Sequence, residues 1–167
     1  MKKYLKTGFT LIELLIVITI IGILTALITT NLTGARSRAR DTRRKSDLRS
    51  IEQGLRLYYN DAKKFPTSTA TFEINGCGTL ASATSCNWGG TFSAGSVPTV
   101  YMSSLPLDPI GNGITYKYLS TSDDKYLLVT SLENLSDPDI SESQARCATA
   151  LGGYSETIET DYAVCVQ

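Results

Sequence analysis

Histidine does not occur anywhere in the 167 residues of the chain. Because histidine is the commonest general base and the commonest metal ligand of enzymes, its absence removes both roles. The sequence also lacks a nucleophile elbow, a glycine-rich phosphate loop and any Cys-x-x-Cys pair. We therefore predict that the protein is not an enzyme and has no zinc knuckle.

Cysteine is scarce, and its four copies lie in the polar second part of the chain, at positions 77, 86, 147 and 165. An even number of cysteines in a small exported domain favours disulfides in an oxidising compartment. Four reduced thiols are the alternative, and four cysteines allow three connectivities. The order along the chain suggests the pairs Cys77–Cys86 and Cys147–Cys165.

Charge is nearly absent from residues 9–30, where Glu13 is the only charged residue. A helix of this length is roughly 33 Å long, enough to cross the hydrocarbon core of a bilayer. Residues 1–8 are short, basic and end in Gly8. A secretory signal peptide has its apolar stretch before the cleavage site, whereas here it follows Gly8. We expect a leader at 1–8 and a transmembrane helix at 9–30 that stays with the mature protein.

A second helical pattern follows the apolar run. Phe65-Pro66 ends it, because a residue before proline avoids the helical region. We predict one continuous helix over residues 9–63, about 80 Å long, whose second half is the amphipathic segment 31–64. The apolar stripe of this half recurs at spacings of three and four residues and consists of Leu48, Ile51, Leu55, Tyr58 and Ala62.

We predict that residues 65–167 form a small globular head that is cross-linked by disulfides. We expect residues 67–100, rich in Gly, Ser and Thr, to be an irregular loop. Two β-branched and aromatic segments predict an antiparallel hairpin, Thr115–Leu119 with Lys125–Ser131. A short helix is expected near Ser141, and a last strand over Tyr162–Val166. The predicted fold class is α+β, with a long N-terminal helix packed on a small antiparallel β-sheet.

The charge of Glu13 is energetically unfavourable within the predicted membrane span. A carboxylate within a membrane span costs about 2.5–3.5 kcal/mol on insertion scales. If the chain is cut after Gly8, the new amine of Phe9 in one copy lies within reach of Glu13 in another copy inside a bundle of such helices. That pair would offset the burial and fix the axial register. The alternative is an interfacial Glu13 that stays hydrated.

The segment Gly8-Phe9-Thr10-Leu11-Ile12-Glu13-Leu14 resembles the prepilin peptidase recognition motif of type IV pilins and type II secretion pseudopilins. The resemblance implies cleavage after Gly8 and N-methylation of Phe9. It also implies that Glu13 docks on the Phe9 amine of a neighbouring subunit, and that the fold is the pilin lollipop. The implied partners are a prepilin peptidase, an assembly platform protein with its ATPase, the membrane, and further copies of the chain in a helical filament.

Further segments carry a weaker resemblance: Asp41–Leu48, Leu55–Asn60, Phe65-Pro66, Leu105–Pro109, Tyr116–Tyr118 and Lys125–Glu133. They are similar to the major pseudopilin of type II secretion, so this resemblance covers roughly residues 1–66 and 105–133. In many major pilins a proline lies eight residues after the glycine that matches Gly22, whereas this chain has Thr30. Gly22 therefore remains the candidate point of helix flexibility. Type II major pseudopilins also bind calcium after the hairpin, and this resemblance makes Glu133, Asp137 and Asp139 calcium candidates. A solvated acidic loop is the alternative.

The charges are unevenly distributed although the net charge is zero. Residues 35–64, the neck, hold ten basic against four acidic residues, and residues 65–167 hold three against eleven. The neck arginines have three interpretations: a solvated helix face, contacts with acidic heads of adjacent subunits, or contacts with DNA phosphates. Nucleic acid is expected only if the filament is a DNA-uptake pilus.

We predict a structural subunit of a type IV pilus or pilus-like filament. A type II secretion pseudopilin is the first alternative, and a membrane-anchored binding protein that does not polymerise is the second. More basic residues follow the apolar run than precede it. By the positive-inside rule, this difference alone would place the head in the cytoplasm. The cysteines and the leader favour the opposite orientation. We expect a single-pass precursor in the cytoplasmic membrane with its head outside, and then a filament at or beyond the cell surface.

Overall fold

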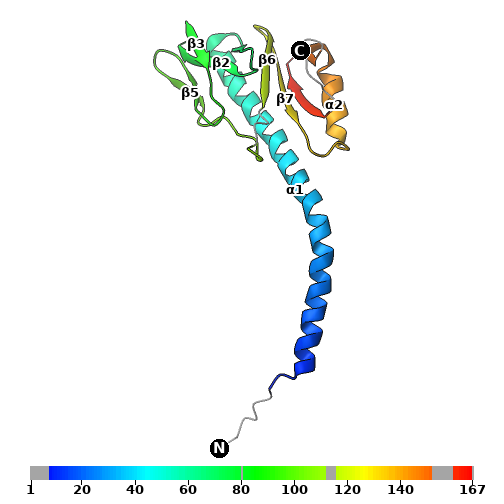
Figure 1. The fold of residues 1–167 in the computed structure, drawn as a ribbon. Helices are drawn as coiled ribbons and strands as arrows, with labels where there is room; N and C mark the ends of the chain where they lie inside the picture. The colour runs from blue at the N-terminus through cyan, green and yellow to red at the C-terminus, as the bar shows by residue number, and fades with distance from the viewer. Residues whose placement is uncertain (1–7, 80, 112–115, 152–159, 167) are drawn as a thin grey trace, which may run out of the picture. The chain divides into compact units, whose positions relative to one another are not determined.

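The computed structural model describes residues 8–79, 81–111, 116–151 and 160–166, except for the side chains of residues 27–31, 121 and 151. The chain divides into two compact units, residues 1–37 and residues 38–167. One helix, α1 (Leu11–Ala62), has residues in both units (Figure 1). Its bounds confirm the predicted helix to within two residues at its start and one at its end.

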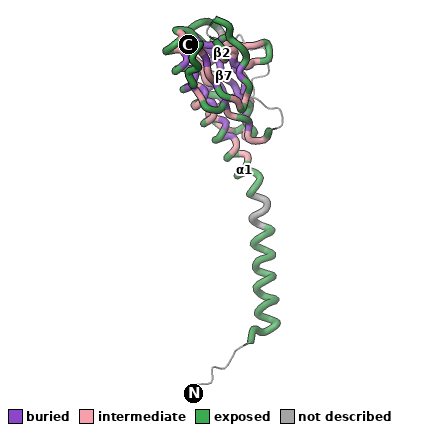
Figure 2. The backbone as a smooth tube through the Cα atoms, turned by 90° about the vertical axis from the view of Figure 1, so that its left-hand side faces the viewer, coloured by how far each residue is buried: buried purple, intermediate pink, exposed green. Residues whose placement is uncertain are grey.

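In the first unit, every described side chain of residues 11–26 is exposed (Figure 2). Gly22 lies inside the helix, and a Cβ added there would meet no atom within 4 Å. Packing within the chain therefore does not require a glycine at this position. Among the residues whose side chains are described, no helix combines the length and the apolar character needed to cross a membrane.

In the second unit, the predicted apolar stripe of α1 faces the core. Leu48, Ile51 and Leu55 are fully buried, and Tyr58 is 4 % exposed. Ala62, the last residue of the stripe, packs partly buried against the same cluster. The helix ends there because Lys63 adopts a positive φ of 57° and Phe65-Pro66 follows. The spacing of three and four residues thus identified the buried face of this half.

A five-stranded sheet occupies the region that we predicted to be an irregular loop, so that prediction is wrong. The strand order is β1-β2-β4-β5, with β3 paired to β2, and β2 and β4 run parallel. Few side chains of this region are large and apolar, but Ile74 and Phe92 are fully buried against α1. The strands are β1 (Thr67–Ser68), β2 (Ile74–Thr79), β3 (Ser82–Ser85), β4 (Phe92–Ala94) and β5 (Thr99–Met102).

One glycine of this sheet is fixed by close packing. A Cβ added at Gly76, in β2, would lie 2.8 Å from Cβ of Pro66. Real Cβ atoms essentially never approach another atom so closely, so this strand passes the end of α1 only with glycine there. The Gly-rich composition that suggested a loop therefore partly reflects tight packing.

A three-stranded antiparallel sheet has the order β6-β7-β8. Its strands are β6 (Lys117–Ser122), β7 (Lys125–Ser131) and β8 (Asp161–Cys165). This confirms the predicted hairpin and the predicted last strand, although Thr115 lies outside the described residues. Tyr118 ties this sheet to the preceding region, because its amide donates to the carbonyl of Phe72 and its hydroxyl to that of Pro66.

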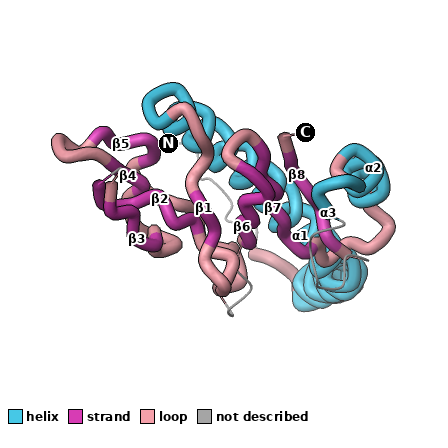
Figure 3. Tube along the Cα trace, turned by 90° about the horizontal axis from the view of Figure 1, so that it is seen from above, coloured by secondary structure: helices cyan, strands magenta, loops and turns pink. Residues whose placement is uncertain are grey.

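Two short helices, α2 (Pro138–Arg146) and α3 (Ala148–Leu151), precede β8. The first confirms the helix expected near Ser141, and Asp137 caps it by accepting a hydrogen bond from the Asp139 amide. Figure 3 shows strands β1–β5 and β6–β8 as two neighbouring groups, with α2 beside β8. Together these elements form the predicted α+β fold.

The helix α2 also covers the outer edge of β8. The amide of Ala163 donates a hydrogen bond to Oγ of Ser143, and Nε2 of Gln144 donates one to the carbonyl of Asp161. Ser143 is fully buried. An uncovered edge strand offers unpaired backbone groups to other chains, so these two side chains protect the edge of the sheet.

The cysteines are paired as their order suggested. Cys77 and Cys86 join β2 to the residue after β3, and Cys147 and Cys165 join the end of α2 to β8. Closing loops of 9 and 18 residues, each bridge stabilises the fold by roughly 2.5–3.5 kcal/mol in the chain-entropy account.

Candidate functional site

The N-terminal candidate site begins before the helix. Residues 8–10 are not helical, and Thr10 is the residue immediately before α1. The Thr10 amide and hydroxyl donate to Oε2 of Glu13 over 2.9 and 2.7 Å, and the Glu13 amide donates to Oγ1 of Thr10 over 3.3 Å. These reciprocal bonds form a capping box, which satisfies otherwise unpaired amides at the start of a helix.

The capping role of Glu13 was not among the roles predicted from the sequence, although its signal is present there. The pattern Thr-x-x-Glu before an apolar run is typical of a capping box. Phe9 is 87 % exposed, and Gly8 is exposed beside it. The predicted cleavage bond between Gly8 and Phe9 thus lies in non-helical, accessible chain. Docking of Glu13 on the amine of another copy concerns a second chain and stays a prediction.

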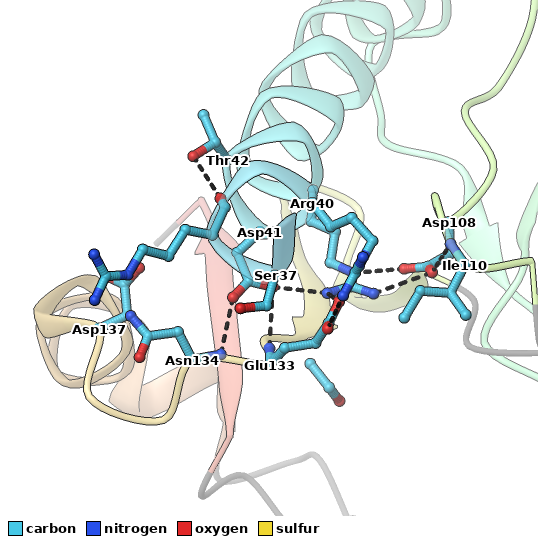
Figure 4. Close-up of polar contacts among 12 residues, drawn as sticks. Ser37, Arg40, Asp41, Thr42, Asp108, Ile110, Glu133, Asn134 and Asp137 are labelled. Atoms are coloured by element: carbon cyan, nitrogen blue, oxygen red, sulfur yellow. Dashed lines mark hydrogen bonds and ion pairs between the residues drawn. The ribbon is translucent and has the colours of Figure 1, made fainter. Parts of the chain in front are cut away.

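In the neck, Arg44 is the centre of a buried ion cluster. Figure 4 labels its three carboxylate partners, Asp41, Asp108 and Glu133. Its side chain is fully buried, and Nε and Nη2 donate to the two carboxylate oxygens of Asp108 over 2.6 and 3.2 Å. Its Nη1 donates to Oδ1 of Asp41 over 2.7 Å and to Oε1 of Glu133 over 2.9 Å. A bidentate Arg–carboxylate pair fixes both partners in orientation. Arg44 therefore joins α1 to two distant segments of the head.

Asp41 and Arg40 strengthen the link to the segment after β7. The two carboxylate oxygens of Asp41 accept the amides of Glu133 and Asn134 over 3.0 and 2.9 Å. Arg40 donates from Nε and Nη2 to the two oxygens of Glu133 over 2.7 and 2.5 Å. One turn of α1 thus holds both the backbone and the side chain of this segment.

These contacts shift the ionisation of the cluster. Hydrogen bonds from Arg40 lower the pKa of Glu133 to about 2, opposed by partial burial and helped by Arg44. Burial acts to raise the pKa of Asp108, but the hydrogen bonds from Arg44 and the Ile110 amide outweigh it and hold this pKa below its usual value. Burial likewise acts against the charged form of Arg44, yet its three carboxylate partners raise its pKa. Asp108, Glu133 and Arg44 are therefore ionised at neutral pH.

Lys45 makes a second link between α1 and the head. Its Nζ donates to Oδ2 of Asp137 over 2.6 Å and to Oδ2 of Asp139 over 2.7 Å. The side chain is 14 % exposed, and Nζ lies 5.6 Å from the ring centroid of Tyr162 in β8. Burial acts to lower the pKa of Lys45, but the bonds to Asp137 and Asp139 outweigh it and raise this pKa.

The structure does not bring the three calcium candidates together as a metal site. Glu133 binds Arg40 and Arg44, whereas Asp137 and Asp139 bind Lys45. Across the described part of the chain, no group of three or more His, Cys, Asp or Glu side chains is arranged to hold a metal ion. The alternative, a solvated acidic loop, agrees with the exposure of Glu133, Leu135 and Ser136, but the carboxylates of this segment also pair with cations of the neck.

One of the three interpretations of the neck arginines, contacts with acidic heads of adjacent subunits, is corrected for two of them. Arg40, Arg44 and Lys45 pair with acids of their own chain, so they are not available to an adjacent one. Arg43 is different, because its side chain is 65 % exposed and its Nε lies 3.9 Å from Asp47. From the sequence, these basic residues were interpreted as one group. In the structure, Arg44 and Lys45 are largely buried, whereas Arg43 is exposed.

Two known protein families match most of the chain. Residues 5–29 match the family described as "Prokaryotic N-terminal methylation motif". Residues 31–138 match the family described as "Type II secretion system (T2SS), protein G". The second match contains the neck, the Arg44 cluster and the strands β1–β7.

Individual relatives agree with this match. The type II secretion system core protein G of Aeromonas hydrophila is 33% identical over 72% of this chain and 77% of its own length. The proteins of the same name from Vibrio cholerae and Pseudomonas aeruginosa are 33% and 30% identical, over 74% and 72% of this chain and 77% and 78% of their own. No solved structure matches the chain significantly.

Proposed function

The chain belongs to the type II secretion system protein G family, and on that premise we propose that it is the subunit of a secretion pseudopilus. A protein of this family is a structural, non-enzymatic subunit, in agreement with the prediction made from the missing histidine. Of the predicted filaments, the comparisons support the secretion pseudopilin over a type IV pilus proper.

One observation carries this choice. The N-terminal motif is shared by pilins and pseudopilins, so it names the class of filament subunit but not the filament. The match over residues 31–138 begins after this motif ends, so it supports the choice independently of the motif. Within that range Arg44, Asp108 and Glu133 join segments far apart in sequence, so the match concerns an interlocked head and not a short motif.

The N-terminal segment supplies the proposed assembly mechanism. We propose that cleavage after Gly8 creates the Phe9 amine, that this amine is methylated, and that it pairs with Glu13 of a neighbouring copy. The capping box engages Oε2 of Glu13, and among the described residues Oε1 has no hydrogen-bond partner. One carboxylate can therefore cap its own helix and still accept a bond from a neighbouring amine. The exposed apolar face of residues 11–26 is the surface that packing of such helices would cover.

The proposal includes a membrane stage. We propose that the apolar run 9–30, which contains residues whose side chains the structure does not describe, anchors the precursor in the inner membrane. The head would then lie on the periplasmic side, where Cys77–Cys86 and Cys147–Cys165 form. The proposed partners are a prepilin peptidase, an assembly platform protein and its ATPase, with further copies of this chain in the filament. Extraction from the membrane would be driven by helix packing and by ATP hydrolysis.

Deletion of the gene in the source organism tests the function. A secretion pseudopilin predicts that proteins normally released to the medium accumulate in the periplasm, while sheared surface pili viewed by electron microscopy are unchanged. Re-expression of the unaltered gene should restore release, and re-expression of a chain lacking Gly8 should not. Loss of surface filaments with normal protein release would instead favour a type IV pilus. Normal release and normal filaments would favour a binding protein that does not polymerise.

A further inference from the structure

The acidic segment between β7 and α2 is the place where the family resemblance implies calcium. Calcium in proteins takes six to eight oxygen ligands at about 2.3–2.6 Å, several of them carboxylates. A fit therefore requires carboxylate oxygens that converge and are not already bound. Glu133, Asp137 and Asp139 can be judged by this criterion.

The oxygens of Glu133 and Asp137 are already occupied. Arg40 binds both oxygens of Glu133, and Arg44 binds one of them as well. In Asp137, Oδ1 accepts the Asp139 amide as the cap of α2, and Oδ2 accepts Nζ of Lys45. A metal ion at these oxygens would have to displace a guanidinium, an ammonium or a helix cap, or share an oxygen with one of them, and both cations would repel it.

Lys45 occupies the position where a cation would bridge the two aspartates. Its Nζ lies 2.6 Å from Oδ2 of Asp137 and 2.7 Å from Oδ2 of Asp139, so both carboxylates meet at one positive charge. A divalent ion beside this ammonium would be repelled, and the repulsion is strong where solvent is partly excluded. The donor set therefore does not fit calcium while Lys45 is present.

We infer that Arg40, Arg44 and Lys45 organise segment 133–139 in place of a divalent metal ion, so that the head folds without calcium. The neck thereby provides cations that are part of the chain itself. Their binding does not depend on the metal content of the compartment. This inference concerns the fold of the head and does not rest on the proposed function.

Thermal unfolding of the full chain in detergent micelles tests the inference, with calcium chloride and with the chelator EGTA. The unaltered chain should unfold at the same temperature in both solutions, and calorimetric titration with calcium should give no binding heat. Lys45→Met keeps the length of the side chain and removes its charge. We expect it to lower the unfolding midpoint by at least about 2–4 °C. Arg43→Met is the matched control, since Arg43 lies on the same turn and is largely exposed, and it should leave the midpoint unchanged.

Two results would overturn the inference. The first is a higher midpoint of the unaltered chain in calcium that Asp137→Asn abolishes, since asparagine still caps α2 but loses the charge. The second is a Lys45→Met chain that unfolds at the same temperature as Arg43→Met. The calcium titration of the unaltered chain decides the matter alone if Lys45→Met does not fold.

Discussion

Arg44 and Asp108 are separated by 64 positions in the sequence and joined by two hydrogen bonds, of 2.6 and 3.2 Å, between side chains that are 0% and 1% exposed. Asp108 lies in the connector between β5 and β6, so this pair fastens the connector to α1. Removal of one partner of a buried ion pair costs far more than the pair contributes on its own, because the other charge is left buried. The two partners are not equivalent here, since Arg44 has three carboxylates and Asp108 has one guanidinium.

The first prediction follows from that asymmetry. Arg44→Met leaves Asp41 and Asp108 buried without their cation, so we expect a loss of about 3–5 kcal/mol of unfolding free energy. Asp108→Asn leaves Arg44 paired with Asp41 and Glu133, so we expect only about 1–3 kcal/mol. Denaturant unfolding of the full chain in micelles measures both values.

Arg56 provides the control for these variants. It forms an i,i+4 pair with Glu52 on the same helix, but its side chain is 61% exposed. Arg56→Met should therefore cost about 0.5 kcal/mol or less. Equal losses for Arg44→Met and Arg56→Met would contradict the assignment of Arg44 as the centre of a buried cluster.

The second prediction concerns acid. The pKa of Glu133 is lowered from 4.5 to about 2, so its contribution to stability is complete above pH 4.5 and is lost as the pH falls toward 2. Over this window the unfolding free energy of the unaltered chain should decrease more than that of Glu133→Gln, by about 1 kcal/mol for a partly exposed group. Asp108 is present in both chains, so its contribution to the pH dependence of the unfolding free energy cancels in the difference. Glu142→Gln, at an exposed position of α2, should follow the unaltered chain, and parallel pH curves for all three proteins would refute the prediction.

The third prediction concerns the covered edge of β8. Ser143→Ala removes the acceptor of the Ala163 amide, which lies 3.1 Å from Oγ in a fully buried position. A buried amide without a partner costs about 1–3 kcal/mol, so we expect this loss together with faster hydrogen exchange at Ala163. Ser141→Ala is the control, because Ser141 is exposed and bonds only within its own helix turn. Slow exchange at Ala163 in the Ser143→Ala chain would show that the edge is protected by other means.

The fourth prediction separates the two roles of Glu13. Glutamine can complete a capping box, so Glu13→Gln keeps the helix start and removes the charge, whereas Glu13→Ala removes both. If Glu13 docks on a neighbouring amine by its charge, both variants should fail to form filaments, as seen by electron microscopy of sheared fractions. Thr10→Ser keeps the cap hydroxyl and should assemble. Immunoblots for the shortened chain check that cleavage is normal in each variant, and normal filaments from Glu13→Gln would limit Glu13 to capping.

Sequence periodicity predicted the parts of the fold that depend on one buried face. Leu48, Ile51 and Leu55 repeat at helical spacing, and the strongly apolar strand β7 sits in a hairpin with clear turn residues, so both could be recognised locally. The strands between Thr67 and Met102 could not. Their side chains are mostly small and polar, and the strands exist because they pair with one another and place a few residues, such as Phe92, on α1.

The buried charges were the hardest feature to predict from the sequence. Arg44 lies in a run of basic residues that resembles a solvated face. Its position four residues before Leu48 continues the spacing of the buried stripe, which Arg43 does not, but its charge argued against burial. Its burial is decided by Asp108, which lies far along the chain and arrives only when the connector folds back on α1. The capping box of Thr10 and Glu13 is the opposite case, because its signal is entirely local and was open to direct recognition.

The position of the capping box has a consequence for how a precursor becomes a subunit. The bond between Gly8 and Phe9 precedes the helix, and the cap uses the amide of Thr10, which remains an amide after a cut at Gly8. The helix therefore begins at Leu11 in the longer chain and in the shorter one. A peptidase acting here would change the charge and the length of the flanking end while every hydrogen bond of the helix stayed in place. If the chain is cut there as proposed, maturation would require no refolding of the helix start, and the cut molecule could be added to a filament with this helix already formed.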